Sequence, residues 1–138
     1  MTSVILVTLA TIGLLNVAQA NEASCLEHFT SEGNKFSGRM YTTWLEFPNV
    51  KKAAAYTKIY ASVAKDGWTI VSSDKDAGIL SASQQVSYGR GATNPLVVVV
   101  EDSGRGSKAT VTFRLGGGQS ASLNTIKKKL CEYIGAAN

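Results

Sequence analysis

Histidine and cysteine are scarce in this chain of 138 residues, and their scarcity argues against two classes of function. One histidine, His28, and two cysteines, Cys25 and Cys131, are too few ligands for a structural zinc site. Nucleophilic catalysis needs a base within hydrogen-bond reach of a serine or thiol, and His28 is the only histidine. No serine stands in the context of a nucleophile elbow. We therefore predict no catalytic residue, no metal site and no cofactor.

The acidic residues and the glycine-rich runs do not predict a catalytic, metal-binding or phosphate-binding site either. Asp74 and Asp76 flank Lys75 in a predicted turn, where aspartates usually bond their own backbone. A calcium site would need more oxygen ligands at regular spacing. The runs 104–108 and 116–120 lack the spacing of a P-loop. The second run precedes a predicted helix, whose free N–H groups could hold an anion, but capping by Ser120 or Ser122 is the simpler account.

Charged side chains are absent from the first twenty residues, which read as an export signal. An apolar stretch from Val4 to Leu15 is followed by Ala18-Gln19-Ala20, the small-residue pattern that precedes signal-peptide cleavage. The stretch is shorter than the roughly 20 residues that cross a bilayer. We predict a cleaved signal peptide at 1–20 and a single α+β domain at 21–138, with no transmembrane segment after processing. Its location would be periplasmic or secreted.

Cys25 and Cys131 stand near opposite ends of that mature chain, and an even cysteine count in an oxidising compartment favours a disulfide between them. A lipid anchor on Cys25 is disfavoured, because Glu22-Ala23-Ser24 precedes it in place of the apolar and small residues that lipoprotein processing requires. We predict the Cys25–Cys131 disulfide, with a short helix in 21–33 that it ties down.

Hydrophobic periodicity predicts the rest of the fold. Residues 50–65 and 122–134 each place apolar side chains on one helical face. Residues 108–115 alternate apolar and polar, so one sheet face should see water, whereas the apolar run 96–100 suggests a central strand covered on both faces. The predicted class is α+β: an antiparallel sheet of about five strands with two main helices on one face, in the order β-α-β-β-β-β-α. The predicted strands are 36–47, 68–73, 79–88, 96–100 and 108–115.

The net charge of +4 lies wholly in the mature part of the chain. A basic exported domain could meet an envelope protein or an anionic component of the envelope. Nucleic-acid binding would need aromatic residues within a dense basic stripe, and the basic residues here are scattered. The candidate binding surface comprises two loop-tip arginines, one arginine on the exposed strand face and two lysines of the last helix: Arg90, Arg105, Arg114, Lys127 and Lys128.

A helix–glycine–strand–turn–strand pattern runs through the middle of the chain. It is carried by Ala61, Gly67-Trp68, Ile70, Asp74, Asp76-Ala77-Gly78, Leu80 and Ala82. The pattern resembles the C-terminal domains of BamC, the outer-membrane assembly lipoprotein, and small bacterial envelope domains of similar layout. The resemblance implies a helix-on-sheet interaction domain without catalytic residues, and it carries over no functional residue.

These observations predict a non-catalytic periplasmic binding or accessory module that recognises its partner through the open sheet face or the arginine loops. The alternative is an inhibitor or immunity protein against an envelope-targeted hydrolase, since a small rigid domain loses little entropy on binding. A third hypothesis, a hydrolase using His28 or Asp74 and Asp76, is the least favoured.

Overall fold

The computed structural model describes residues 13–86 and 91–138, which form one antiparallel sheet with helices on one side. The start of the predicted signal peptide, the end of the strand predicted to reach Tyr88, and Arg90 lie outside these residues. The elements are α1 (Gly13–Glu27), β1 (Thr30–Asn34), β2 (Gly38–Phe47), α2 (Lys52–Lys65), β3 (Thr69–Asp74), β4 (Ile79–Gln85), β5 (Thr93–Ser103), β6 (Gly106–Leu115) and α3 (Leu123–Gly135).

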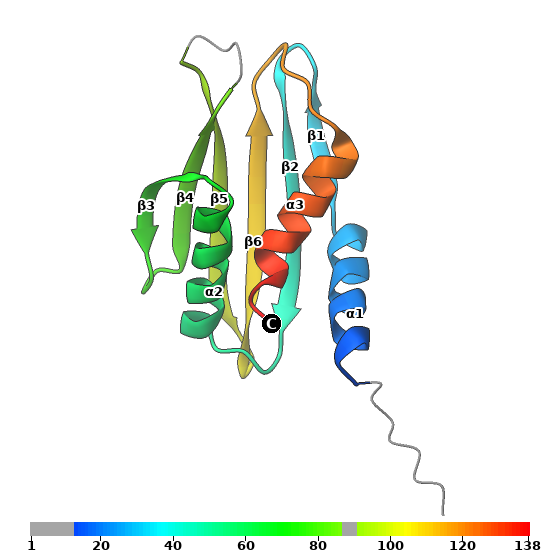
Figure 1. The fold of residues 1–138 in the computed structure, drawn as a ribbon, viewed down its shortest axis with the longest axis vertical. Helices are drawn as coiled ribbons and strands as arrows, with labels where there is room; N and C mark the ends of the chain where they lie inside the picture. The colour runs from blue at the N-terminus through cyan, green and yellow to red at the C-terminus, as the bar shows by residue number, and fades with distance from the viewer. Residues whose placement is uncertain (1–12, 87–90) are drawn as a thin grey trace, which may run out of the picture.

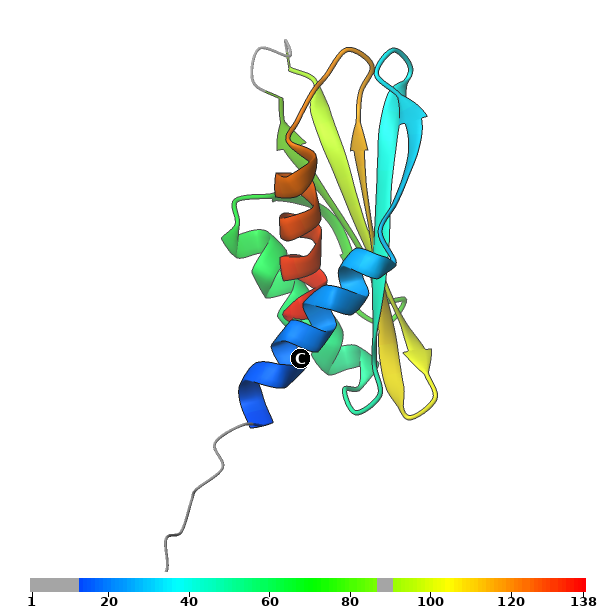
Figure 2. The same ribbon diagram turned by 90° about the vertical axis from the view of Figure 1, so that its right-hand side faces the viewer.

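The strands lie in the order β1-β2-β6-β5-β4-β3, and every neighbouring pair is antiparallel (Figure 1). After the β1–β2 hairpin, α2 carries the chain across to the far edge, and β3 to β6 then return strand by strand until β6 pairs with β2. The helices cover one face and leave the other open (Figure 2). The predicted α+β class is confirmed, with six strands where about five were predicted.

The additional strand is β1, in a segment where we predicted a short helix within 21–33. The helix is present as α1 but ends at Glu27, and β1 follows it. The Asn34 side-chain oxygen accepts hydrogen bonds from the N–H groups of Phe36 and Ser37, both at 2.9 Å, which closes the turn into β2. All five residues of β1 are exposed, so backbone pairing with β2 alone defines the strand.

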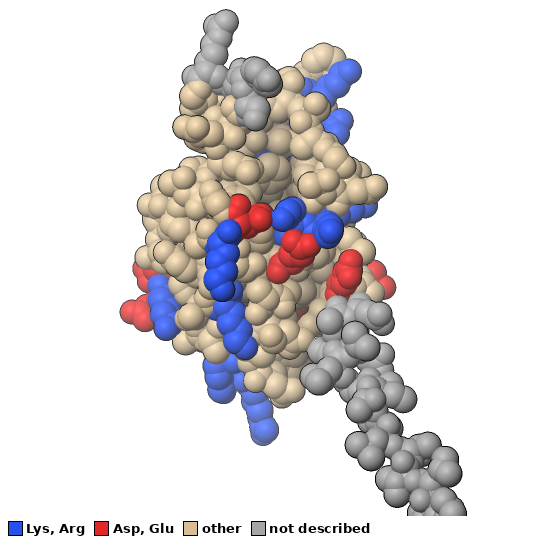
Figure 3. Space-filling view, viewed as in Figure 1, with Lys and Arg blue, Asp and Glu red and all other residues tan. Residues whose placement is uncertain are grey.

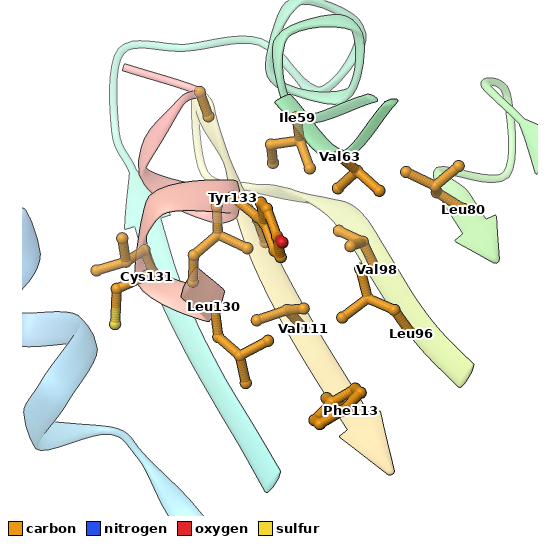
Figure 4. Close-up of a cluster of buried hydrophobic side chains, with 14 of the residues drawn as sticks. Ile59, Val63, Leu80, Leu96, Val98, Val111, Phe113, Leu130, Cys131 and Tyr133 are labelled. Carbon is orange, nitrogen blue, oxygen red and sulfur yellow. The ribbon is translucent and has the colours of Figure 1, made fainter. Parts of the chain in front are cut away.

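The core lies between the helix layer and the inward face of the sheet (Figure 4). Ile59 and Val63 of α2 point toward the β4 and β5 side chains, and Leu130 and Tyr133 of α3 lie over β6. The predicted alternation of β6 is confirmed: Ala109, Val111, Phe113 and Leu115 are buried on the helix side, and Lys108, Thr110, Thr112 and Arg114 face the other way.

The predicted two-sided burial of 96–100 is wrong. Leu96, Val98 and Val100 are buried against the helices, but Val97 and Val99 are only half-buried on the open face. None of the helices that the structure describes covers that face (Figure 2), and the half-burial comes from flanking strands, since Val97 pairs with Thr112 and Ser81. A continuous apolar run has therefore formed a strand with one covered face.

The predicted disulfide is confirmed, with an S–S distance of 2.04 Å between Cys25 and Cys131. It joins the last turn of α1 to α3, and both cysteines are buried. The hydroxyl of Thr43 on β2 donates a hydrogen bond to the Cys25 carbonyl, so α1 is attached both to the helix layer and to the sheet.

Candidate functional site

A cleft of about 710 Å³ lies at the end of the sheet where β6 leaves it. β6 ends at Leu115, and residues 116–118 turn the chain toward α3, while β2 and β5 flank β6 on its two sides. The start of β2, the start of β5 and the segment leading to α3 therefore all line the cleft. Figure 3 shows the surface hollowed between the upper part of β5 and the segment that leads from β6 into α3.

Two arginines line this cleft from adjacent strands. In the β2–β6 register, Arg39 is paired with Leu115 and Met40 is paired with Arg114. Because side chains alternate along a strand, the Arg39 side chain leaves the backbone on the helix side of the sheet, and the Arg114 side chain leaves it on the open side. Both side chains are exposed, and neither forms an ion pair or hydrogen bond with any residue in 13–86 or 91–138. The two guanidinium groups are thus available to a ligand.

Amide side chains and one carboxylate complete the polar lining. Asn94 is only 9% exposed and lines the cleft. The Gln119 side-chain oxygen accepts a hydrogen bond from the N–H of Gly116 at 2.9 Å. Glu32 of β1 stands on the outer wall, one strand beyond Met40. Among the described residues, no buried side-chain nitrogen or oxygen lacks a hydrogen-bond partner, so Asn94 is not an orphaned polar group.

The four predicted binding residues that the structure describes do not form one surface. Arg114 lines the cleft, but Arg105 lies in the β5–β6 turn at the other end of β6, and the strand's 10 residues span roughly 30 Å. Lys127 and Lys128 belong to α3 in the helix layer, on the opposite side of the sheet from the Arg114 side chain. Lys127 Nζ lies 5.3 Å from the centroid of the Phe29 ring.

Sequence reasoning missed Arg39 and Asn94, which the fold brings to the cleft from distant parts of the chain. Arg39 is the second residue of β2, and Asn94 is the second residue of β5. They become neighbours of one cleft only because β6 inserts between β2 and β5. No local motif surrounds either residue, so only a correct strand order could have indicated the pair.

His28 and Asp74, two of the residues considered for catalysis, each make a structural contact. His28 stacks on Trp44 with ring centroids 3.4 Å apart, and its Nδ1 lies 2.9 Å from the Trp44 carbonyl oxygen. Asp74 accepts a hydrogen bond from the N–H of Ala77, as expected of a turn aspartate. Ser122 caps α3 by accepting from the N–H of Thr125 at 3.4 Å, in agreement with the simpler account of that segment. Within the described ranges, no group of three or more His, Cys, Asp or Glu residues is placed to hold a metal.

A second polar cluster joins the end of α2 to α3. The Tyr133 hydroxyl donates to the Asp66 carboxylate and accepts from Trp68 Nε1 at 2.8 Å, and Lys129 Nζ lies 3.1 Å from Asp66 Oδ1. Tyr133 lowers the pKa of Asp66 by donating to its charged form, with help from Lys129. Burial, together with the bond to Asp66, raises the pKa of Tyr133. Lys129 also lies 3.7 Å from Glu132, and Figure 3 shows charges of both signs intermixed over the middle of the helix layer.

No protein-family model matches this chain, and no curated protein matches it significantly. Among the helices that the structure describes, none has both the length and the apolar character needed to span a membrane. The function must therefore be inferred from the chemistry of the cleft and of the scaffold that holds it.

Proposed function

We propose that this protein is an exported, non-catalytic binding module of the cell envelope, and that the cleft between β2, β5 and β6 is its binding site. The observation that carries the proposal is the lining of that cleft, which includes two exposed arginines without ion-pair partners among the described residues. Guanidinium groups that the protein leaves unneutralised are suited to an external anionic group.

The scaffold supports export. A disulfide between residues 106 positions apart is expected to persist in an oxidising compartment, and the first twenty residues have the pattern of a cleaved signal. Cleavage before Asn21 would leave the last turns of α1, with Cys25, attached to the domain. The proposed location is accordingly the periplasm or the extracellular medium.

Non-catalytic binding is supported by what the reactive side chains do. His28 is stacked on Trp44, both cysteines are joined in a disulfide, and Asp74 holds its own turn. General acid–base or nucleophilic catalysis would need at least one of these groups to face a ligand site. Of these side chains, none lines the cleft.

The pattern that resembles BamC lies in the scaffold, away from the cleft. The helix–glycine–strand–turn–strand pattern corresponds here to α2, Gly67, β3, the turn 75–78 and β4. These elements lie toward the β3 edge of the sheet, and none of their residues lines the cleft. We propose that the shared pattern builds the scaffold, whereas the cleft is this chain's own binding feature.

Two measurements test the proposal, and the first concerns export. Protein recovered from the periplasm or medium of the source cells should have the mass of a chain beginning at Asn21. Its cysteines should react with an alkylating reagent only after reduction. An unprocessed cytosolic chain with freely alkylated cysteines would contradict the export proposal.

The second measurement concerns the cleft. Chemical crosslinking in intact cells should join the wild-type protein to one envelope partner, and Arg39→Glu with Arg114→Glu should abolish that product. Arg105→Glu is the matched control, because it makes the same charge change at the far end of β6. Equal loss in the control and the double variant would mean that overall charge, and not the cleft, directs binding. If the partner is a hydrolase that the protein inhibits, the inhibitor hypothesis replaces the accessory role.

A further inference from the structure

We infer that the open face of the sheet is the interface of a symmetric dimer, in which this face packs against the same face of a second copy of the chain. This inference goes beyond the proposed function, because the cleft lies only at one end of this face. The surface concerned is the one that α1, α2 and α3 leave uncovered (Figure 2). Its middle, which we call the central patch, comprises the outward-facing first and last residues of 42–44, 79–81, 97–99 and 110–112.

The central patch carries no charge, and half of its side chains are apolar. Ile79, Val99 and Trp44 belong to one row across the sheet and Val97 to the next, with threonine and serine at the other positions. Ile79 is 43% exposed, and the three other apolar side chains are half-buried. An antiparallel sheet with one face in water normally has polar side chains on that face. A lack of charge and a tryptophan are instead typical of the core of a protein–protein interface.

The patch can be covered at little cost, because its polar groups and its largest side chain are already held. The hydroxyl groups of Thr42 and Thr112 lie 3.3 Å apart and form a hydrogen bond between β2 and β6. Burial therefore leaves neither hydroxyl without a partner. Trp44 is stacked on His28 with 3.4 Å between the ring centroids, and Lys108 Nζ lies 4.5 Å from the centroid of the Trp44 ring. A side chain that is ordered in advance loses little rotamer freedom on association.

The size of the face matches what a stable dimer needs. Strands lie about 4.8 Å apart and rise about 3.4 Å per residue, so each residue covers roughly 16 Å² of sheet. The six strands, which are 5 to 11 residues long, therefore present an open face of roughly 800 Å². A standard protein–protein interface buries about 800 Å² on each partner. The central patch would form its apolar core, and the residues around the patch would form its polar rim.

The charges that border the patch make the face complementary to itself. In the row next to the patch, Glu101 and Lys108 lie side by side on β5 and β6, and these two side chains form no ion pair with each other. A two-fold axis parallel to the strands, between β5 and β6, places β5 of each copy over β6 of the other. Each Lys108 then comes within side-chain reach of Glu101 of the second copy. Because of the symmetry, this favourable contact is made twice.

The same axis brings the apolar side chains together. Val97 lies opposite Thr112 of the second copy, close to the axis, and Trp44 of β2 lies opposite Ile79 of β4. Two sheets that pack face to face are about 10 Å apart and cross at about 30°, so that their side chains interdigitate. The cleft lies beyond the patch at one end of the sheet, so it stays accessible in each copy.

Sedimentation velocity of the purified, disulfide-bonded protein at about 5–300 µM tests the inference. We expect a particle with twice the mass of the single chain and a dissociation constant of about 100 µM or lower. Two-dimensional ¹H–¹⁵N NMR over the same dilution series locates the interface, because the chain has two tryptophans. The indole N–H signal of Trp44 should shift as the dimer dissociates. That of Trp68, which is buried and bonded to the Tyr133 hydroxyl, should keep its position.

Substitutions within the patch test which face forms the dimer. Thr112→Lys and Val97→Glu should each weaken the dimer at least about tenfold, because each buries a charge without a partner. Thr57→Lys is the matched control and should dimerise as the wild type does, because Thr57 is exposed on α2, on the other side of the sheet. An equimolar mixture of the Thr112→Lys and Val97→Glu proteins should form a heterodimer, because the introduced lysine and glutamate lie opposite each other across the axis. In each variant, an unchanged Trp68 signal shows that the core is intact.

Each outcome decides the inference. A dimer that both patch substitutions weaken, that the control keeps and that the mixture restores supports it. A monomer at every concentration, an unchanged dimer in the patch variants, equal weakening in the control or an unchanged Trp44 signal overturns it. A mixture that forms no heterodimer overturns the two-fold axis, and the inference with it. A monomer that captures a different protein through this face also overturns it, because the occupant would not be a second copy.

Discussion

Replacing Tyr133 by phenylalanine removes a single hydroxyl group that connects α2 to α3. The hydroxyl donates to the Asp66 carboxylate just after α2, and it accepts a hydrogen bond from Trp68 Nε1 at 2.8 Å. The phenylalanine ring keeps the apolar contacts of Tyr133 with the core. The substitution therefore isolates the two hydrogen bonds from the packing around them.

Two contributions set the expected loss of stability. A hydrogen bond to a charged acceptor stabilises by about 1.5–3 kcal/mol, and leaving a buried donor without a partner costs about 1–3 kcal/mol. The Asp66 side chain is 36% exposed, so water replaces part of its lost contact. Trp68 is only 9% exposed, so its N–H group gains little water. We expect Tyr133→Phe to lower the free energy of unfolding by about 2–3 kcal/mol.

Urea unfolding at about pH 7 measures this loss, which should appear as a lower midpoint with an unchanged slope. Asp66→Asn and the Tyr133→Phe/Asp66→Asn double variant complete a double-mutant cycle. We expect a coupling free energy of about 1 kcal/mol between the two side chains, because they share a direct hydrogen bond. A loss below about 0.5 kcal/mol, or additive effects in the cycle, would refute the assigned network.

The effect of pH gives an independent check. The bond from Tyr133, helped by Lys129, holds the pKa of Asp66 below its ordinary value of 3.8. The unfolded chain therefore binds more protons, so this contribution is present above about pH 4 and is lost as pH falls through the folded pKa. Tyr133→Phe raises the pKa of Asp66 toward its ordinary value. The stability deficit of the variant should shrink at about pH 2.5, although the part due to the unpartnered Trp68 N–H should remain. A deficit that does not depend on pH would contradict the assignment.

Two further substitutions test the scaffold. Replacing both Cys25 and Cys131 by alanine should lower the free energy of unfolding by about 4–5 kcal/mol, because the disulfide joins residues 106 positions apart. In urea unfolding, a reductant should shift the midpoint of the wild type but not that of the double variant. Gly106→Ala should destabilise the domain by more than about 2 kcal/mol in thermal unfolding, because its Cβ would overlap the Phe47 carbonyl oxygen. Gly104→Ala is the control: it meets open space, and its φ of +57° should cost only about 1 kcal/mol. Equal effects of the two glycine substitutions would count against the close approach of β6 to β2.

Periodicity and cysteine count were enough to predict much of the scaffold. Apolar and polar residues alternate at 108–115, as they do in a strand with one solvent-facing side, and β6 has this pattern of burial. The apolar face at 122–134 predicted α3, which covers Leu123–Gly135. Two cysteines without a surplus thiol predicted the disulfide that the structure contains.

Two parts of the fold carry no such pattern. The sequence Thr-Ser-Glu-Gly-Asn of β1 has no apolar residue and no buried side chain, so only its pairing with β2 makes it a strand. The valines of β5 would suit burial on one face or on both, and the outcome depends on α1, α2 and α3 all lying on the other side of the sheet. In neither case does the segment's own apolar pattern decide the outcome: β1 depends on its pairing with β2, and the burial of β5 depends on where the helices lie.

The candidate site was only partly predictable for the same reason. Arg114 could be placed on the exposed face from the alternation of its own strand. Its grouping with Arg39 and Asn94 depends on β6 lying between β2 and β5, a strand order that hydrophobic periodicity does not encode. Scattered basic residues therefore gave a candidate surface that the fold divides between the two ends and the two faces of the sheet.

The two outermost strands give the sheet poor templates for recruiting further chains. β1 is short, carries Glu32 and ends in glycine-containing polar sequence, and β3 is interrupted by a register shift between Ile70 and Ser72. Short, charged or bulged borders discourage continuous backbone pairing with a neighbouring molecule. Concentrated solutions of the folded, oxidised protein should therefore resist fibrillar growth, even though valines make up much of the middle of the sheet.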